Sequence, residues 1–128
     1  MLKGIVYVST MINTSLSVIK DLSVKFEKTN NINGITGLLL FSSGIVMQYI
    51  EGEPSKIDTL FSNIKNDNRH YNIIKLLDEE IHSKIFKDWG MKFKNVELPQ
   101  LKDLESRMST DKRNILIILK SFIKVNDL

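Results

Sequence analysis

The chain has 128 residues and a formal net charge of +3, which is the size of one ordinary domain and too small for two. It contains no cysteine, so a disulfide scaffold, a thiolate nucleophile and a zinc site with sulfur ligands are excluded. The positive charge comes from fifteen lysines but only three arginines, the residue best suited to bidentate phosphate contacts. We therefore expect a globular domain with no nucleic-acid partner.

The sequence shows no targeting or membrane-spanning pattern. Residues 1–5 lack the long apolar stretch and small-residue cleavage site of a signal peptide. The longest nearly apolar run, residues 115–119, is much shorter than the roughly 20 residues that cross a bilayer. We expect a cytoplasmic protein without a membrane partner.

Hydrophobic periodicity predicts a βαββαββ order of elements in the first 95 residues. In chain order the predicted elements are a strand at 5–8, a helix from the polar cluster 13–15 to Phe26 and on to 30–34, a strand at 35–41, a turn at 42–44, a strand at 45–50, a helix from Pro54 to Ile64, a strand at 73–77 and a short strand near 89–93. This order is that of a ferredoxin-like α+β fold with one added strand, in which both helices cover one face of the sheet.

In the predicted strand at 35–41, the residues that point to either face are apolar, so both faces of the sheet should be covered. Residues 96–128 are the candidates for the second face. Pro99 opens one predicted helix there, and residues 109–111 start another that is apolar nearly all round. We expect this helical pair to pack on its own sheet, or alternatively on a second copy of the chain. The chain thus divides into a core domain, 1–95, and a two-helix extension, 96–128.

Signatures of common enzymes are absent from the sequence. The six glycines have neither the G-x-G-x-x-G nor the Walker spacing, and the only two histidines, His70 and His82, are too far apart to form a metal pair on one helix. An acylphosphatase-like enzyme with the same strand order would need an arginine in the loop after the first strand, and residues 9–13 contain none. We therefore do not expect an enzyme.

Three polar residues interrupt otherwise apolar elements. Tyr7 lies inside the first strand, Gln48 lies among valine and isoleucine in the third, and Asn31 closes the first helix. A buried glutamine must satisfy both its donor and its acceptor groups, so its presence in a core requires partners. The alternative is that Gln48 faces solvent while Met47 and Tyr49 face the core.

Five short segments carry the most specific signal in the sequence. In chain order they are Ile5-Val6-Tyr7, Asn30-Asn31-x-Asn33-Gly34-Ile35-Thr36-Gly37-Leu38-Leu39, Gln48-Tyr49-Ile50-Glu51-Gly52, Asp67-x-Arg69-His70 and Asp88-Trp89-Gly90-Met91. Together, in this order and spacing over residues 2–94, they resemble the BLUF domain, a blue-light sensor that uses a non-covalently bound flavin.

The resemblance implies that the flavin ring lies between the two sheet-packed helices. Asn31 matches the asparagine that meets the C4 carbonyl and N3–H edge of the ring, and Asn30 matches a less central contact. The alternative is that both residues only end the helix. Gln48 matches the glutamine between flavin and tyrosine, and Tyr7 matches that tyrosine. An excited flavin is a strong oxidant, a phenol can donate an electron and a proton, and a glutamine can rotate or tautomerise to leave a different hydrogen bond.

The remaining motifs imply a relay and a contact with the cofactor tail. Trp89 and Met91 match a pair on the last strand that passes the change outward, and residues two apart share one face of a strand; Trp89 could equally be ordinary core. Arg69 and His70 match the basic end of the second helix near the ribityl–phosphate tail, with Lys65 as a helper. Alternatively, His70 is simply a helix-end residue favoured by the dipole.

The resemblance as a whole implies a blue-light photoreceptor that is not an enzyme. Its chromophore would be FAD, with FMN or riboflavin as alternatives, and its output would pass through the last strand and the C-terminal helices to an unidentified protein partner. We also expect a homo-oligomer. The competing hypothesis is a flavin-free, ferredoxin-like regulatory interaction module.

Overall fold

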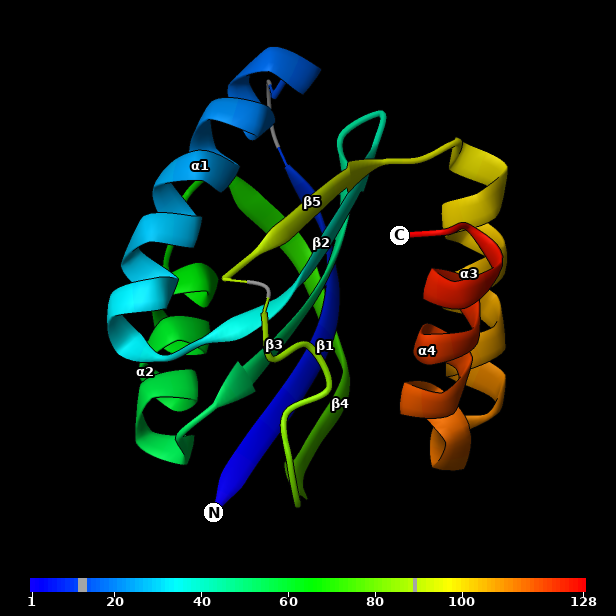
Figure 1. Ribbon diagram of the computed structural model, residues 1–128. Coiled ribbons are helices and arrows are strands. Elements are labelled where there is room, and N and C mark those ends of the chain that lie inside the picture. Colours follow the sequence, from blue (N-terminus) through cyan, green and yellow to red (C-terminus); the bar gives the residue numbers. More distant parts are fainter. Residues whose placement is uncertain (12–13, 89) are drawn as a thin grey trace.

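In the computed structural model, which describes residues 1–11, 14–88 and 90–128, one five-stranded sheet separates two layers of helices (Figure 1). The elements are β1 (Leu2–Met11), α1 (Leu16–Asn33), β2 (Thr36–Ser42), β3 (Ile45–Gly52), α2 (Pro54–Lys65), β4 (His70–Ile81), β5 (Lys92–Asn95), α3 (Leu98–Thr110), a 3₁₀ turn η1 (Lys112–Asn114) and α4 (Ile115–Val125). The strand order is β4-β1-β3-β2-β5, and only β2 and β5 are parallel. The predicted α+β class and ferredoxin-like order are confirmed.

Local sequence signals set the ends of the two helices on the first face. Ser15 caps α1 by accepting a hydrogen bond from the backbone N–H of Val18, and Gly34 ends the helix in the left-handed region at φ 68°. Pro54 opens α2, where its missing N–H costs no helical hydrogen bond. The helix start predicted at residues 13–15 therefore falls at Ser15.

The sheet buries side chains on both faces, as the apolar strand predicted. All seven residues of β2 are buried. The core under α1 and α2 includes Ile5, Leu39, Val46, Ile50, Ile19, Ile57 and Phe61. The core under α3 and α4 includes Val6, Leu38, Met47, Leu101, Leu104, Met108, Ile115 and Phe122. Each fully buried Leu or Ile contributes roughly 1.5–3 kcal/mol, so the C-terminal helical pair is an integral layer that packs on its own sheet.

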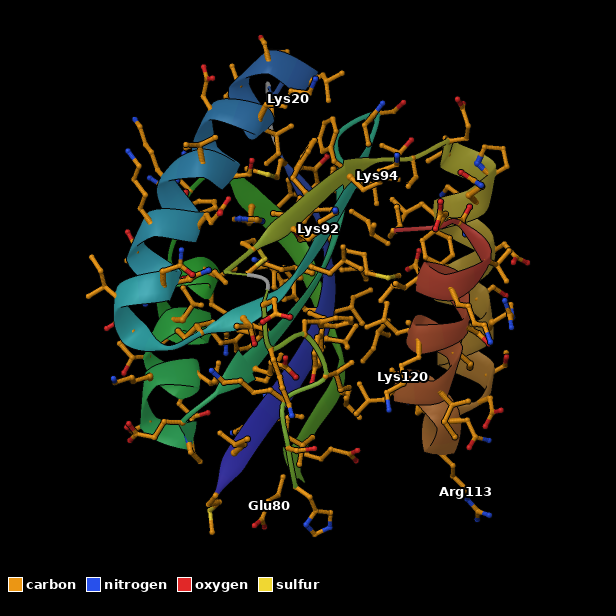
Figure 2. The ribbon with its side chains drawn as sticks, viewed as in Figure 1. Lys20, Glu80, Lys92, Lys94, Arg113 and Lys120 are labelled. Carbon is orange, nitrogen blue, oxygen red and sulfur yellow. The ribbon has the colours of Figure 1, made fainter. Side chains whose placement is uncertain are left out.

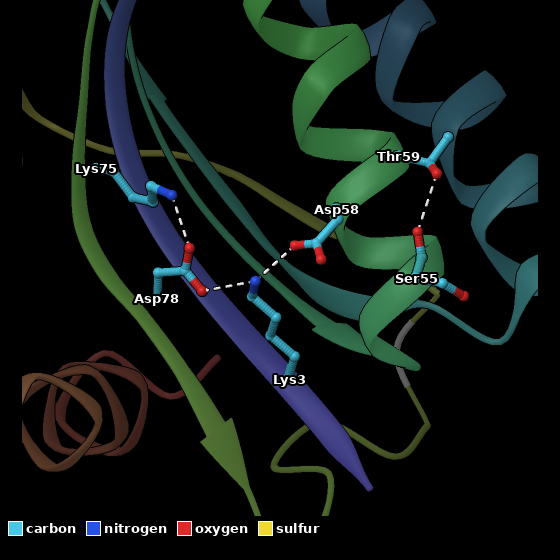
Figure 3. Close-up of polar contacts among 6 residues, drawn as sticks. All are labelled: Lys3, Ser55, Asp58, Thr59, Lys75 and Asp78. Carbon is cyan, nitrogen blue, oxygen red and sulfur yellow. Dashed lines mark hydrogen bonds and ion pairs between the residues drawn. The ribbon is translucent and has the colours of Figure 1, made fainter.

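Salt bridges tie α2 to the edge of the sheet. Lys3 Nζ on β1 lies 2.5 Å from Asp58 of α2 and 2.9 Å from Asp78 of β4, and Lys75 reaches the other oxygen of Asp78 at 2.6 Å (Figure 3). The two carboxylates raise the pKa of Lys3 above its ordinary value. Because the groups are partly exposed, each pair contributes only about 0–1 kcal/mol, and of these pairs Lys3–Asp58 is the one that joins α2 to the sheet.

Two predicted boundaries are wrong, with consequences for the site. The helix α2 ends at Lys65, and the Asp67 carboxylate then accepts the backbone N–H of Arg69 in a tight turn, so His70 is the first residue of β4 and not a helix residue. The last strand covers Lys92–Asn95 rather than 89–93, so Met91 precedes it. The strand β4 is longer than predicted because an edge strand tolerates exposed polar residues.

Candidate functional site

A cavity of about 260 Å³ lies between α1, α2 and the adjoining face of the sheet. Its apolar lining consists of Met11, Ile19, Phe26, Leu39, Val46, Leu60 and Ile64, and its polar lining of Tyr7, Thr29, Asn30, Gln48, Asn63, Asp67 and His70. An ordered water molecule needs only about 10–15 Å³ of such space, so the cavity can hold a much larger molecule. Apolar walls with a few convergent polar groups are typical of sites for small organic ligands and cofactors.

Tyr7 and Gln48 form the central polar contact of the cavity wall. The antiparallel register of β1 and β3 places them opposite each other. The Tyr7 hydroxyl donates a hydrogen bond to Gln48 Oε1, and Gln48 Nε2 donates to Met91 Sδ at 3.4 Å. All three side chains are buried. The alternative in which Gln48 faces solvent is therefore wrong, and its two ends are used by different partners.

The surroundings of Tyr7 keep its phenol protonated. Its ring packs against Phe61 with centroids 5.6 Å apart and meets the edge of His70 at 6.2 Å. Burial, and secondarily the charge of Asp67, raise the pKa of Tyr7 well above its ordinary value of 10. Tyr7 is therefore a hydrogen-bond donor throughout the physiological pH range.

Among the three basic residues expected near a cofactor tail, His70 lines the cavity. Its Nδ1 lies 2.7 Å from Ser9 Oγ on the neighbouring strand β1. Burial lowers the pKa of His70, partly opposed by the nearby Asp67 carboxylate. The imidazole is therefore held in its neutral form beside Tyr7.

Arg69 and Lys65 have other partners in the described structure. Arg69 forms a forked contact with Asp67, at 3.0 Å from Nε to Oδ1 and 2.5 Å from NH2 to Oδ2, which lowers the pKa of Asp67 to about 2. Lys65 lies 5.9 Å from the centre of the Phe61 ring and lines a neighbouring depression with Tyr71. The Asp67 carboxylate, to which sequence reasoning gave no role, thus stands at the cavity with its own counter-ion.

The two asparagines at the end of α1 have different environments. Asn30 is buried and lines the cavity, and its Nδ2 is the one buried side-chain polar atom in the described residues without a hydrogen-bond partner. Asn31 is exposed, and its side chain lies against Gly90. The helix phase turns Asn30 toward the cavity and Asn31 away from it, and the expected contact of Asn31 with the flavin ring stays a prediction.

The unpaired amide of Asn30 is consistent with a bound flavin. A buried donor without an acceptor costs about 1–3 kcal/mol, and a carbonyl oxygen in the cavity would satisfy it. A flavin ring offers such carbonyls on an otherwise flat, apolar surface, and the cavity lining has the same character. The residues present therefore fit the group.

Of the two residues of the predicted relay, the structure describes Met91 but not Trp89. Met91 is buried in the core under α1 and α2 and contacts Gln48. Trp89 lies outside the described residues.

In the part of the chain that is described, no cluster of three or more histidine and carboxylate side chains could hold a metal ion. None of its helices is both long enough and apolar enough to cross a membrane.

Glu51 is the residue that sequence reasoning missed. It is 0% exposed and lies on β3, facing the C-terminal helices, where it shares a side with Met47 and Tyr49. The sequence did contain a signal for Glu51. It is an acidic residue inside a mostly apolar strand, and when such a residue is buried it needs hydrogen-bond partners, as Gln48 does.

Comparison with known proteins identifies the family. The model of the BLUF family, described as sensors of blue light using FAD, matches residues 2–92. The chain therefore belongs to the BLUF family and is a flavin-based blue-light sensor. It is 34% identical over 64 residues to the photoactivated adenylate cyclase subunit beta of Euglena longa, covering 50% of the chain and 7% of that protein. It is 30% identical over 78 residues to the blue light- and temperature-regulated antirepressor BluF of Escherichia coli K12, covering 61% and 19%.

A solved structure extends the similarity to almost the whole chain. The dark-state structure of the BLUF protein BlrB superposes with a TM-score of 0.78 at 28% identity, covering 98% of this chain and 96% of BlrB. The match therefore includes the C-terminal helical pair. The 128 residues span less than a fifth of the length of the two curated relatives named above.

Proposed function

We propose that this chain senses blue light through FAD held non-covalently between α1 and α2, with Tyr7 and Gln48 as its switch. The observation that carries the proposal is the placement of Gln48 in the cavity wall, between the Tyr7 hydroxyl and Met91 Sδ. The family description names FAD, and the lack of cysteine suits a chromophore that is not covalently attached.

Asn30 and the apolar walls would hold the cofactor. The unpaired Asn30 Nδ2 would donate to a carbonyl of the ring, while Ile19 and Leu39 would supply apolar contact. His70, neutral and at the cavity wall, would lie toward the tail without adding charge. Asn31, Arg69 and Lys65 would take secondary roles, because each is exposed or has another partner.

When bound, the flavin supplies absorption of blue light and a transient, reversible oxidant. The residues of the chain do the rest. Tyr7 holds its proton along the bond to Gln48 Oε1, so the proton has a short, ready path to the carboxamide. Gln48 can exchange its donor and acceptor ends by rotation or tautomerisation. Either change withdraws Nε2 from Met91 Sδ and so alters the contact that holds Met91.

The signal would leave through the end of the sensor core. Met91 directly precedes β5, the edge strand beside β2, and β5 leads into α3. On the far layer, α4 keeps Ile117 63% exposed next to Lys120, which Figure 2 shows projecting from this helix. We propose that α3 and α4 present this surface to a protein partner or to a second copy of the chain in the cytoplasm.

The test is an absorption spectrum of the FAD-loaded protein before and after blue light. We expect a small, reversible red shift that Tyr7→Phe and Gln48→Leu abolish while flavin stays bound. Tyr71→Phe and Gln100→Leu, on the exposed surface, are matched controls that should keep the shift. A normal shift in both site variants would overturn the switch. A colourless protein that takes up no flavin would favour a flavin-free interaction module, and chromatography of the released cofactor would separate FAD from FMN and riboflavin.

A further inference from the structure

The carboxylate of Glu51 accepts four hydrogen bonds inside the protein. The hydroxyl of Thr36 donates to Oε2 at 2.8 Å, and the hydroxyl of Tyr49 donates to Oε1 at 3.0 Å. The backbone N–H groups of Ile85 and Phe86 donate to Oε1 and Oε2, each at 2.7 Å. Every donor is neutral, and the two shortest bonds come from consecutive peptide groups.

This arrangement is unusual for a fully buried acid. An ionised carboxylate is an acceptor only and is costly to bury unless each oxygen is well satisfied. Here two N–H groups and two hydroxyls provide that satisfaction, and hydrogen bonds to a charged acceptor are roughly twice as strong as neutral ones. Gly4 contributes indirectly, because a Cβ at that position would lie 2.8 Å from the Tyr49 hydroxyl oxygen. Glu51 thus forms a strong anchor for the chain at 85–86.

The anchored residues belong to the connection between β4 and β5, residues 82–91, whose far end is Met91. Strand alternation places Gln48 and Glu51 of β3 on opposite faces of the sheet. The connection is therefore held by the Glu51 carboxylate on one face, while Met91 Sδ receives Gln48 Nε2 on the other. A third contact, from Lys84 Nζ to the carbonyl oxygen of Gly34 at 2.5 Å, secures its beginning.

We propose that Glu51 is a positioning residue for the light-sensing reaction: by holding the peptide groups at 85–86 it fixes where Met91 stands relative to Gln48. This inference rests on the proposed function, because the Gln48–Met91 contact is part of the switch. Glu51 is separated from the cavity by the sheet itself and acts only through the connection.

Glu51→Gln in the FAD-loaded, 128-residue chain tests the proposal. The substitution keeps the size of the side chain but turns one oxygen into an NH₂ donor that faces donors. We expect amide hydrogen exchange at Ile85 and Phe86, measured in the dark, to quicken about tenfold, the equivalent of one lost hydrogen bond. We also expect return to the dark spectrum after illumination to slow by about threefold or more, with flavin content unchanged. Glu80→Gln, on the exposed end of β4 (Figure 2), is the matched control.

Each outcome has a distinct meaning. Unchanged exchange in Glu51→Gln overturns the anchor, and faster exchange with an unchanged recovery rate overturns the positioning role. A wild-type chain that shows no light response defeats the proposed function, while the dark exchange measurement still decides the anchor. If Glu51→Gln does not fold, Thr36→Val and Tyr49→Phe each remove one donor and should shift both measurements in the same direction by less; no shift in either variant overturns the proposal.

Discussion

Asn30 and Asn31 are consecutive in the chain, yet Asn30 faces the cavity and Asn31 covers Gly90 outside it. Successive helical residues point about 100° apart, so the last turn of α1 serves two structures at once. One amide is available to a ligand, and the other packs on the segment that leads to Met91.

The first prediction concerns cofactor affinity. Asn30→Ala removes the unpaired donor and should weaken FAD binding by about tenfold, the value of one hydrogen bond to a buried group. Asn31→Ala is the neighbouring control and should change affinity by less than about twofold. Titration of the flavin-free protein with FAD, followed by fluorescence, measures both. Equal losses in the two variants would show that the inward asparagine has no special role.

The second prediction concerns the contact between Asn31 and Gly90. A Cβ at position 90 would lie 2.2 Å from Asn31 Oδ1, so Gly90→Ala should lower the free energy of unfolding by about 1–3 kcal/mol. Truncating the opposing side chain removes the clash, so Asn31→Ala in the Gly90→Ala background should restore most of the loss. Urea denaturation of the four proteins measures the coupling, and simple additivity would contradict the contact.

The third prediction concerns the sulfur of Met91. Met91→Leu conserves volume and should cost less than about 1.5 kcal/mol in stability, but it removes the acceptor for Gln48 Nε2. We expect the illuminated state to persist up to about fivefold longer, because the dark arrangement loses a weak hydrogen bond. Met108→Leu, equally buried but in the core under α3 and α4, is the control. The same recovery rate in both variants would exclude the sulfur from the switch.

The fourth prediction concerns pH. Because the folded-state pKa of His70 lies below its ordinary value of 6.5, the unfolded chain binds more protons than the native chain between the two values. The contribution of His70 to the free energy of unfolding should therefore be constant above pH 6.5 and should fall as the pH drops below that value. His70→Gln, which can still bond Ser9, should flatten the decline in thermal midpoint between pH 7 and 5, whereas exposed His82→Gln should not. A decline that persists fully in His70→Gln would rule His70 out as its source.

Patterns that repeat along an element could be predicted from the sequence. The apolar β2 required a second helical layer, and residues 98–125 supply it. The pairing of Tyr7 with Gln48 was implied by the resemblance to the BLUF domain, and the register of β1 and β3 places the two residues opposite each other. The sequence could not show which of the two consecutive asparagines at the end of α1 faces the cavity, because a shift of the helix by one residue exchanges their directions. The short strand β5 has too few residues for its periodicity to define its start.

Contacts that a side chain makes with backbone groups could not be predicted from the sequence. The donors to Glu51 at positions 85 and 86 lie 34 and 35 residues away and are backbone groups, which carry no residue-specific signal. Similarly, the turn at Asp67 that removes Arg69 and His70 from α2 depends on one side chain accepting a backbone N–H. Such features become visible only when the chain is folded.

The central position of β3 has a consequence for how information can cross this molecule. Hydrogen bonds to β1 and β2 on both edges lock its register, and a slip of one residue would exchange its two faces. The strand is thus a fixed partition between the chromophore side and the helical side, and communication must go around it. We expect a glycine-rich insertion after Asn95, between β5 and α3, to leave the colour and the spectral shift intact while disconnecting α3 and α4 from light.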